Sequence, residues 1–348
     1  MIGVCFEKIG CVQVRELPDP AIETSNDAIV RVSLAGLCGS DLHPFFGREA
    51  GLEPGTVMGH EFVGEVIATG SNVKNIRVGD RVCSPFTTSC GQCYYCTAGL
   101  TSRCTTGQLF GWRQNDKGLH GGQASLVRVP LADGTLMPIP AGMSDETALL
   151  LGDNLSTGQF AADTAGVSAS GIYAVIGCGT VGLLAIAAAK TMGGGEIIAV
   201  DPCQPRLEIA KSLGASTFSS ADDALKAVRS RTDGRGADGI MEMVGLPDAQ
   251  SLAYAMLRPG GTLSVIGCHC TPHFSFSPAD AYDKNLTYCT GRCPARHYMS
   301  RLSDQAELAT RDLSWCITHR FGLNDAVRAY EVFSQRQDQC IKAVLHLE

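Results

Sequence analysis

A glycine-rich turn between an apolar strand and an apolar helix most constrains how this chain can fold. The stretch "SGIYAVIGCGTVGLLAIAAAKTMGGGEIIAVD" (170–201) runs from one apolar segment through the turn, an apolar helix and a glycine break to a second apolar segment. This order predicts a strand–helix–strand unit. Further helix-like and strand-like segments alternate after it, at 205–215 (helix), 237–245 (strand), 246–261 (helix ended by Pro-Gly-Gly) and 262–267 (strand). The alternation predicts an α/β domain with a parallel, doubly wound sheet over 151–289.

Three glycines of the turn, Gly177, Gly179 and Gly182, complete the spacing G-x-G-x-x-G between the strand and the helix. In this context the motif predicts a dinucleotide site. The first glycine makes the tight turn, the second lets a pyrophosphate approach the backbone, and the third lets helix and strand pack closely. The helix N-terminus, with Thr180 and Val181, favours the anion.

Asp201 ends the second strand, 19 residues after Gly182. A carboxylate there can accept hydrogen bonds from the ribose hydroxyls and would repel a 2′-phosphate. The sequence therefore predicts NAD as the cofactor. Arg206 lies close enough to weaken this preference, and NADP stays the alternative.

The first 150 residues have a different pattern. Short β-branched runs at 28–35 and 62–70 are separated by Gly, Pro and Asp turns, and 73–82 fits a hairpin turned at Gly79-Asp80. Beyond about residue 290 the helix–strand alternation fades. We therefore expect a first domain of 1–150 to which 290–348 returns, and a second domain of 151–289.

Four cysteines, Cys90, Cys93, Cys96 and Cys104, are spaced C-x2-C-x2-C-x7-C. Four thiolates on a compact loop can surround one tetrahedral zinc ion, and such a closed site is structural. An iron–sulfur cluster also uses four cysteines, although no proline follows Cys104 and the spacing differs from the common ferredoxin patterns. Two disulfides would be disfavoured in a chain that remains in the cytosol.

Composition limits the location and the partners. The net charge is −7, and no basic cluster suggests a nucleic-acid partner. The N-terminal "MIGVCFEKIG" lacks the pattern of a signal peptide, and the longest apolar stretch (181–189) is too short to span a bilayer. We expect a cytoplasmic protein without a membrane partner.

A second group of possible ligands is spread over three segments. "AGLCGSDLH" (35–43) contains Cys38, Ser40 and His43, "MGHEFVGEV" (58–66) contains His60 and Glu61, and "LGDNLSTG" (151–158) contains Asp153. Each residue alone is ambiguous, because a buried cysteine, a core histidine or an aspartate in a turn needs no ligand.

Taken together and in this order, with "VGDRV", the four-cysteine segment, "GCGTVG" and Asp201, the chain resembles the zinc-dependent medium-chain alcohol dehydrogenases over nearly its whole length. The resemblance implies a GroES-like β-barrel catalytic domain and a Rossmann cofactor domain. It also implies the reversible oxidation of a small-molecule alcohol to an aldehyde or ketone, with two zinc ions per chain. The catalytic ion would be held by Cys38, His60 and a third ligand, for which Asp153 takes the position that is a cysteine in many members.

The resemblance also assigns roles to the neighbouring residues. Ser40 would accept the alcohol proton, which the family passes through the nicotinamide ribose to His43 and solvent. Glu61 would either approach the metal as an alternative ligand or remain outside the ligand set.

Some positions depart from the best-known members. Gly39 stands where the animal and plant enzymes carry an arginine that contacts the pyrophosphate. The segments "FGWRQND" (110–116) and "GRCPA" (291–295) look more like microbial tetrameric members, which implies a homotetramer, with a dimer as the alternative. Trp112 would line the substrate pocket or serve as a core aromatic, and Arg292 would lie near the pocket or form a surface ion pair.

Alternatives for the function stay open. A polyol, threonine or formaldehyde dehydrogenase would use the same scaffold. A non-catalytic dinucleotide-binding protein, structural or regulatory, is an alternative of another class, but it has no need to keep Cys38, His60, Asp153 and Ser40 together.

Overall fold

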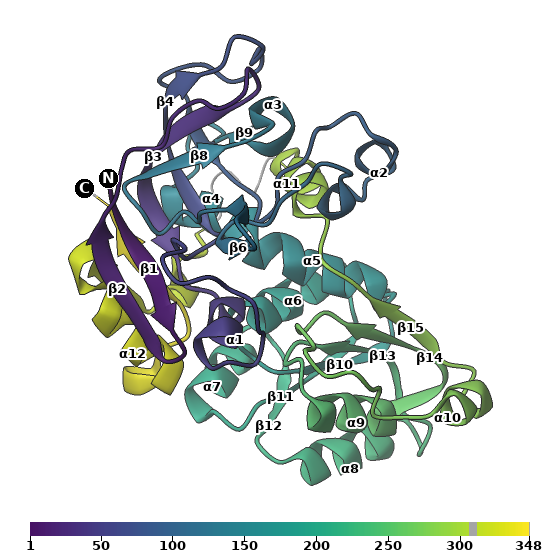
Figure 1. Cartoon of the computed structure of the whole chain (residues 1–348). Helices are drawn as coiled ribbons and strands as arrows, with labels where there is room; N and C mark the ends of the chain where they lie inside the picture. The colour runs from purple at the N-terminus through teal and green to yellow at the C-terminus, as the bar shows by residue number, and fades with distance from the viewer. Residues whose placement is uncertain (306–311, 348) are drawn as a thin grey trace. The chain divides into compact units, whose positions relative to one another are not determined.

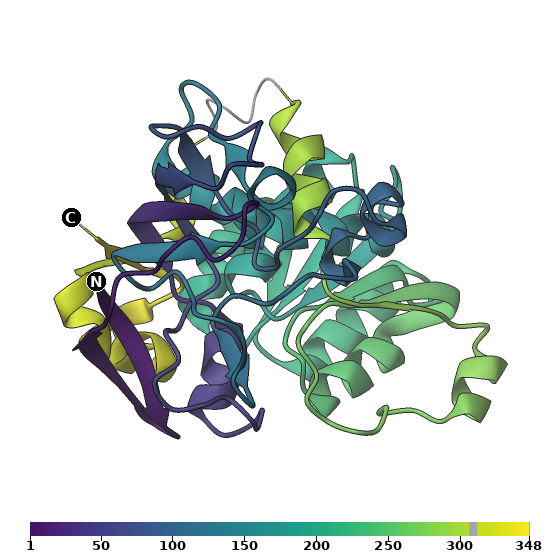
Figure 2. The same ribbon diagram turned by 45° about the horizontal axis from the view of Figure 1, so that its top comes forward.

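The structure is a computed structural model that describes residues 1–305 and 312–347. The chain forms two compact units, of which the first joins Met1–Ser156 to Pro294–Glu348 and the second is Thr157–Cys293. Segments from both ends of the chain thus belong to the first unit (Figures 1 and 2). The domain limits expected from the sequence, after residues 150 and 289, fall inside a helix and a strand, because apolar patterning locates elements better than their ends.

The second unit contains one parallel sheet and the helices that connect its strands. Its elements are α5 (Asn154–Thr164), which begins in the first unit, β10 (Ile172–Ile176), α6 (Thr180–Thr191), β11 (Glu196–Val200), α7 (Gln204–Ser212), β12 (Ser216–Phe218), α8 (Ala221–Arg231), β13 (Ala237–Glu242), α9 (Pro247–Met256), β14 (Leu257–Val265), α10 (Pro278–Asp283) and β15 (Thr287–Thr290). The strand order is β12-β11-β10-β13-β14-β15, and each neighbouring pair is parallel.

This strand order reverses direction at β10, so that α6 and α7 pack together on one face of the sheet and α8 and α9 on the other (Figures 1 and 2). The central strands β10 and β11 are buried on both faces. This explains why they read as continuous apolar runs in the sequence. The predicted doubly wound parallel sheet is confirmed.

The start of β14 differs from the prediction. The helix α9 ends at Met256, and Leu257 already pairs with Ala237 of β13. The Pro-Gly-Gly segment therefore lies within the strand, and the register of the pair shifts there. Gly260, with φ +67°, permits the bulge that absorbs the extra residues. The prediction that Pro-Gly-Gly ends the helix is wrong, because bulges accept both residue types.

The first unit is rich in short strands. Up to the second unit its elements are β1 (Ile2–Lys8), β2 (Cys11–Glu16), β3 (Ala28–Gly36), η1 (Gly39–Asp41), α1 (Leu42–Phe45), β4 (Phe62–Thr69), β5 (Arg81–Cys83), α2 (Tyr94–Thr97), η2 (Thr101–Arg103), β6 (Trp112–Gln114), β7 (Lys117–Leu119), β8 (Leu126–Val129), α3 (Ala132–Thr135), β9 (Met137–Pro138) and α4 (Asp145–Gly152). After the second unit follow α11 (Ala295–Ser303), η4 (Ser314–Cys316), β16 (His319–Gly322), η5 (Leu323–Asp325), α12 (Ala326–Gln335), η6 (Gln337–Gln339) and β17 (Ala343–His346).

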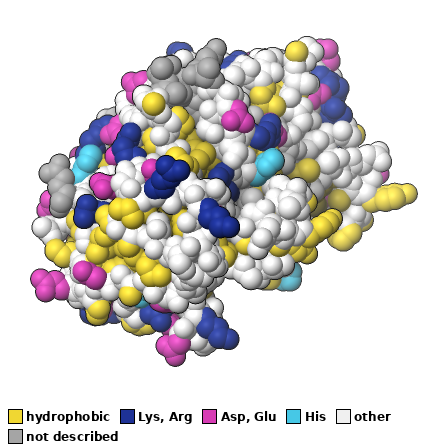
Figure 3. Space-filling view, turned by 90° about the horizontal axis from the view of Figure 1, so that it is seen from above, with side chains coloured by type: hydrophobic (Ala, Val, Ile, Leu, Met, Phe, Trp, Pro, Cys, Tyr) yellow, Lys and Arg dark blue, Asp and Glu magenta, His cyan; other side chains and the backbone are white. Residues whose placement is uncertain are grey.

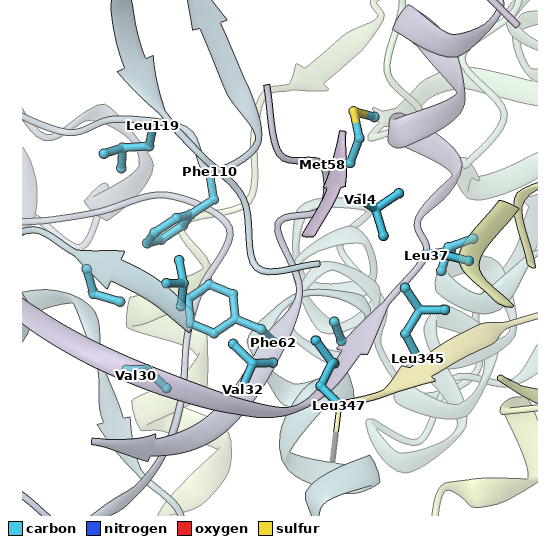
Figure 4. Close-up of a cluster of buried hydrophobic side chains, with 14 of the residues drawn as sticks. Val4, Val30, Val32, Leu37, Met58, Phe62, Phe110, Leu119, Leu345 and Leu347 are labelled. Carbon is cyan, nitrogen blue, oxygen red and sulfur yellow. The ribbon is translucent and has the colours of Figure 1, made fainter. Parts of the chain in front are cut away.

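A seven-stranded sheet in the order β16-β17-β3-β4-β5-β9, with β8 also paired to β3, organises this unit. The last strand, β17, pairs antiparallel with β3, so the C-terminal segment completes the sheet. Figure 4 shows Val32 of β3 and Phe62 of β4 in the core cluster that also contains Leu345 of β17. The rings of Phe62 and Phe110 meet edge to face with centroids 5.1 Å apart. The core is thus built from both ends of the chain.

The hairpin predicted over 73–82 is wrong. Only the end of this segment is a strand, where β5 begins at Arg81. Side chains satisfy the backbone before it: Asp133 accepts hydrogen bonds from the N–H groups of Lys74 and Asn75, and Asp80 accepts one from that of Arg77. These bonds replace a strand ladder and make the segment a turn.

The surface is mixed in charge. Figure 3 shows one face of the molecule, on which basic and acidic side chains are interspersed among apolar and other polar ones. Within the described residues, every helix is too short or too polar to cross a membrane.

Gly182 is the glycine of the turn where a side chain has least room. A Cβ there would overlap the carbonyl oxygen of Gly177, whereas a Cβ on Gly179 would meet only Arg206, at 3.9 Å. We expect Gly182→Ala to lower the free energy of unfolding by about 1–3 kcal/mol, the usual cost of overpacking. The matched control Gly179→Ala should leave it unchanged. Urea unfolding of both variants measures this, and equal stabilities would show that the contact between β10 and α6 is not tight.

Candidate functional site

The first unit brings Cys38, His60, Glu61 and Asp153 together, with one ligand atom of each within 4.8 Å of all the others. We call these four residues the acidic cluster. Asp153 Oδ2 lies 3.5 Å from His60 Nε2 and 3.7 Å from Cys38 Sγ. Cys38 follows β3, His60 and Glu61 precede β4, and Asp153 lies between α4 and α5. The fold therefore brings together the possible ligands that lie on three separate segments of the sequence.

The acidic cluster carries an excess of negative groups. Burial raises the pKa of Cys38, and the carboxylates of Asp153 and Glu61 raise it further. Burial alone would lower the pKa of His60, but the carboxylates of Asp41 and Asp153 outweigh it and raise that pKa well above its usual value. A site that retains protons this strongly favours a cation, and thiolate, imidazole and carboxylate are zinc ligands. The donors fit a zinc ion.

A chain of buried hydrogen bonds orients the ring of His60. Its Nδ1 lies 3.1 Å from Asp41 Oδ1. The other carboxylate oxygen of Asp41 accepts hydrogen bonds from the backbone N–H of Cys38 (2.9 Å) and from Gln123 Nε2 (3.4 Å). The hydroxyl of Tyr330 donates to Gln123 Oε1 at 2.9 Å. This arrangement leaves Nε2 facing the cluster, as in carboxylate–histidine–metal sites.

Glu61 is held by two buried partners. Its Oε2 forms an ion pair with Lys342 Nζ, and its Oε1 accepts a hydrogen bond from Asn154 Nδ2 at 2.9 Å. The side chains of Glu61 and Lys342 are 0% and 1% exposed. Burial opposes the ammonium charge, but the Glu61 carboxylate, with Cys38 and Asp153, raises the pKa of Lys342. The lysine is therefore charged and compensates part of the cluster.

Asp41, Gln123, Tyr330, Asn154 and Lys342 were not identified from the sequence. Asp41 was within reach, since an aspartate one residue after Ser40 in the quoted motif could have been examined as a partner of a ligand. Lys342 carries no such signal, because a lysine just before a final apolar strand reads as a surface residue.

Ser40 lies in the cluster and His43 in the short helix that follows. The Ser40 hydroxyl donates to Cys38 Sγ at 3.2 Å and lies 3.3 Å from His60 Nε2. His43 is buried in α1, and this burial lowers its pKa. Ser40 thus places a hydroxyl directly beside two possible ligand atoms.

The four-cysteine segment also gathers its sulfur atoms, those of Cys90, Cys93, Cys96 and Cys104, within 4.8 Å of one another. Backbone N–H groups point at sulfur: that of Cys93 donates to Cys90 Sγ (3.3 Å) and that of Cys90 to Cys104 Sγ (3.2 Å). Backbone hydrogen bonds lower the pKa of Cys93 to about 6, which favours the thiolate that binds metal. Burial raises the pKa of Cys96 to about 12, so without a cation the group retains a proton there. The four donors fit a closed tetrahedral ion.

In the second unit, Asp201 ties the glycine turn to the end of β11. Its Oδ2 accepts a hydrogen bond from the N–H of Cys178 and its Oδ1 one from that of Cys203, both at 2.8 Å. Gly177 has φ +91°, which favours glycine, and α6 begins immediately after Gly179 with Thr180, Val181 and Gly182. The carboxylate thus has a structural role in addition to any contact with a ligand.

Arg206 of α7 lies beside this turn. Its Nη1 is 3.6 Å from Asp201 Oδ2, and its buried Nε has no hydrogen-bond partner among the described residues. A buried donor without a partner costs free energy. A bound phosphate or hydroxyl would satisfy it, so the turn and Arg206 fit a dinucleotide.

Three other positions that the sequence analysis considered are Trp112, Arg292 and Gly39. Trp112 is half-buried and packs against the core of the first unit, and Arg292 is exposed. At Gly39 a Cβ would meet nothing within 4 Å, so the fold does not require glycine where other members have arginine.

Comparison with known proteins gives concordant matches. Residues 24–141 match the alcohol dehydrogenase GroES-like domain, and residues 180–307 match the zinc-binding dehydrogenase family. A zinc-type alcohol dehydrogenase B of Aspergillus flavus is 42% identical over 97% of this chain and 80% of its own length. An L-threonine 3-dehydrogenase of Bacillus licheniformis is 32% identical over 94% of this chain and 93% of its own. The solved structure of alcohol dehydrogenase TADH from Thermus sp. ATN1 is 36% identical, covers 99% of both chains and superimposes with a TM-score of 0.92.

The buried ion pair gives a test of stability. Lys342→Met would leave the Glu61 carboxylate buried without its counter-charge, which we expect to cost about 3–5 kcal/mol of unfolding free energy. The double variant Glu61→Gln with Lys342→Met should recover most of this loss. Lys226→Met is the matched control, because Lys226 and its partner Asp223 are exposed and such pairs contribute about 0–1 kcal/mol. Urea unfolding that gives equal losses for Lys342→Met and Lys226→Met would contradict the assignment.

Proposed function

The chain belongs to the zinc-dependent medium-chain alcohol dehydrogenases, and on this premise we propose that it oxidises an alcohol reversibly to an aldehyde or ketone with NAD as the hydride acceptor. The observation that carries the proposal is the acidic cluster with the Ser40 hydroxyl beside it. A non-catalytic dinucleotide-binding protein would gain nothing from such a cluster.

We propose that Cys38, His60 and Asp153 hold a catalytic zinc ion, which leaves a coordination position for the substrate. When bound, zinc supplies a Lewis acid that lowers the pKa of the alcohol hydroxyl. Glu61 remains outside this ligand set, because Lys342 and Asn154 engage both of its oxygens. The ring of His60 is presented by Asp41.

A bound nicotinamide would supply the hydride acceptor, and the hydroxyl proton of the alcohol would pass to the protein. Ser40 accepts this proton, since its hydroxyl lies against the ligand atoms of Cys38 and His60. His43 passes it on toward solvent. Its pKa is lowered by burial, so the ring is neutral near pH 7 and able to take a proton.

The four-cysteine segment is proposed as a structural zinc site, which makes two zinc ions per chain. Four sulfur donors that already share backbone N–H bonds leave no open position for a substrate. An iron–sulfur cluster is the alternative that elemental analysis distinguishes.

The cofactor is proposed to be NAD. A buried carboxylate at Asp201 disfavours a second phosphate on the ribose. Arg206 pairs with this carboxylate and keeps NADP as the alternative. Gly177, Gly179, Thr180, Val181 and Gly182 would hold the pyrophosphate.

A threonine dehydrogenase is the alternative within the family, because an L-threonine 3-dehydrogenase is among the related proteins. Polyol and formaldehyde dehydrogenases share the scaffold too. Kinetics with a panel of primary and secondary alcohols, polyols, L-threonine and formaldehyde would identify the substrate class. A homotetramer, or a dimer, is the assembly that the resemblance to microbial members suggests.

Ser40 is tested by separating proton transfer from metal binding. The parent should hold about two zinc ions per chain. Ser40→Ala should retain them and lose on the order of 10²-fold or more in kcat for alcohol oxidation, whereas Ser40→Thr, which keeps a hydroxyl, should remain active. Cys38→Ser should instead lose zinc. If Ser40→Ala keeps both zinc and parental turnover, the serine is only a turn residue.

The cofactor preference attributed to Asp201 is tested by removing the charge of this side chain while keeping its shape. Asp201→Asn retains an acceptor for one of the two backbone N–H groups, whereas Asp201→Gly removes both acceptors and releases the turn. We expect Asp201→Asn to shift the ratio of kcat/KM for NADP over NAD upward by about tenfold or more, since one charge pair near 4 Å is worth about 1–4 kcal/mol. Steady-state kinetics with both cofactors measures the ratio. A parent enzyme that already prefers NADP would overturn this reading of Asp201.

A further inference from the structure

We propose that Cys268 and Cys270 form an oxidisable pair of thiols, which a low-molecular-weight disulfide converts into an intramolecular disulfide. This modification site goes beyond the proposed function, and only its effect on dinucleotide binding rests on that function. The described residues include all sixteen cysteines, and among them these two alone are exposed. Their sulfur atoms lie within 4.8 Å of each other.

The pair lies in the loop after β14, with His269 between the two cysteines. His269 Nε2 lies 2.9 Å from Glu242 Oε2. The histidine is therefore anchored to Glu242 at the end of β13, while the two sulfur atoms flanking it in sequence lie close together. Residues two apart are at most about 7 Å apart at Cα, near the upper limit for a disulfide, so closing the bond requires the loop to bend.

This loop has little freedom to bend without moving its neighbours. The backbone N–H groups of Ile266 and Gly267 both donate to the carbonyl oxygen of Glu242 at 2.9 Å. A Cβ on Gly245 would overlap the carbonyl oxygen of Cys268, so the loops after β13 and β14 touch backbone to backbone. Bending at Cys268 therefore shifts the loop after β13.

The loop after β13 in turn contacts the glycine turn. Glu242 Oε1 accepts hydrogen bonds from the N–H groups of Val244 (2.7 Å) and Gly245 (2.9 Å). A Cβ on Gly177 would lie 2.6 Å from Val244 Cγ2, so Val244 packs directly on the first glycine. The contacts from Cys268 through Gly245 and Val244 to Gly177 are contiguous. Disulfide formation should thus weaken dinucleotide binding.

The chemistry is thiol–disulfide exchange. One cysteine, as thiolate, attacks a sulfur of the oxidant and releases the first small thiol. The second cysteine attacks the mixed disulfide, forms the Cys268–Cys270 bond and releases the second small thiol. The protein loses two electrons and two protons, and the oxidant takes up both.

Peptide mapping tests the disulfide itself, whatever the cofactor is. Zinc-loaded protein is incubated with oxidised glutathione, quenched with an alkylating reagent, digested and analysed by mass spectrometry. We expect a peptide with an internal Cys268–Cys270 bond that dithiothreitol removes. Zinc content is measured in parallel, because oxidation of the metal ligands would release it. If both residues are alkylated as thiols after oxidation, or carry only separate glutathione adducts, the proposal is wrong.

Dinucleotide titration tests the consequence. Oxidation should weaken NADH binding to the parent about tenfold, within the usual range of coupling between sites. By reciprocity, saturating NADH should stabilise the reduced pair and raise its midpoint potential by about 30 mV, the equivalent of tenfold for two electrons. Both effects should vanish in Cys268→Ser and in Cys270→Ser and persist in Cys289→Ser, a half-buried cysteine of the same unit.

The outcomes separate the two proposals. A mapped disulfide in a protein that never binds NADH would overturn the proposed cofactor and leave the thiol pair standing. A mapped disulfide with unchanged NADH affinity would overturn the coupling through Val244. If oxidation weakened NADH binding as much in Cys268→Ser as in the parent, the oxidised site would lie elsewhere.

Discussion

A buried excess of negative charge is the constraint on which the first unit depends. Cys38, Glu61 and Asp153 converge in a place where an isolated charge is very costly. One compensating charge is fixed, because Lys342 pairs with Glu61. The carboxylates of Asp41 and Asp153 raise the pKa of His60 well above its usual value, so the site as a whole favours a further positive charge. A divalent ion would supply that charge, so the same imbalance that is costly to bury prepares the site for zinc.

The polar groups around this cluster are also what join the parts of the unit. Lys342 precedes β17 and Tyr330 lies in α12, both near the end of the chain, whereas the ligands lie in its first half. The C-terminal segment therefore contributes to the site as well as to the sheet. In the second unit a single carboxylate plays a comparable part, because Asp201 holds the turn that it also faces. In both units, groups that position the site are also groups that hold the fold.

Local patterns were predictable and long-range partners were not. The glycine turn and the four cysteines are each encoded within a few residues, and so is the alternation that gives the parallel sheet. Cys38, His60 and Asp153 come from three segments and were brought together only by the family resemblance. Gln123 and Lys342 have meaning only through residues 82 or more positions away. The hairpin at 73–82 failed for a related reason, since Asp133, far along the chain, accepts the hydrogen bonds that a strand would need.

The cysteines show how environment divides one residue type among several tasks. Desolvation raises the pKa of Cys83, Cys178 and Cys316 to about 12, so these buried thiols are poor nucleophiles. The ligand cysteines are organised by neighbouring sulfur, carboxylate and backbone N–H groups, and metal binding would protect them. Thiol chemistry with solutes is then left mainly to cysteines that are exposed. Among the described cysteines the two exposed ones lie in the loop after β14, where a covalent change would reach the glycine turn through the backbone contact of Cys268 with Gly245 and the packing of Val244 on Gly177.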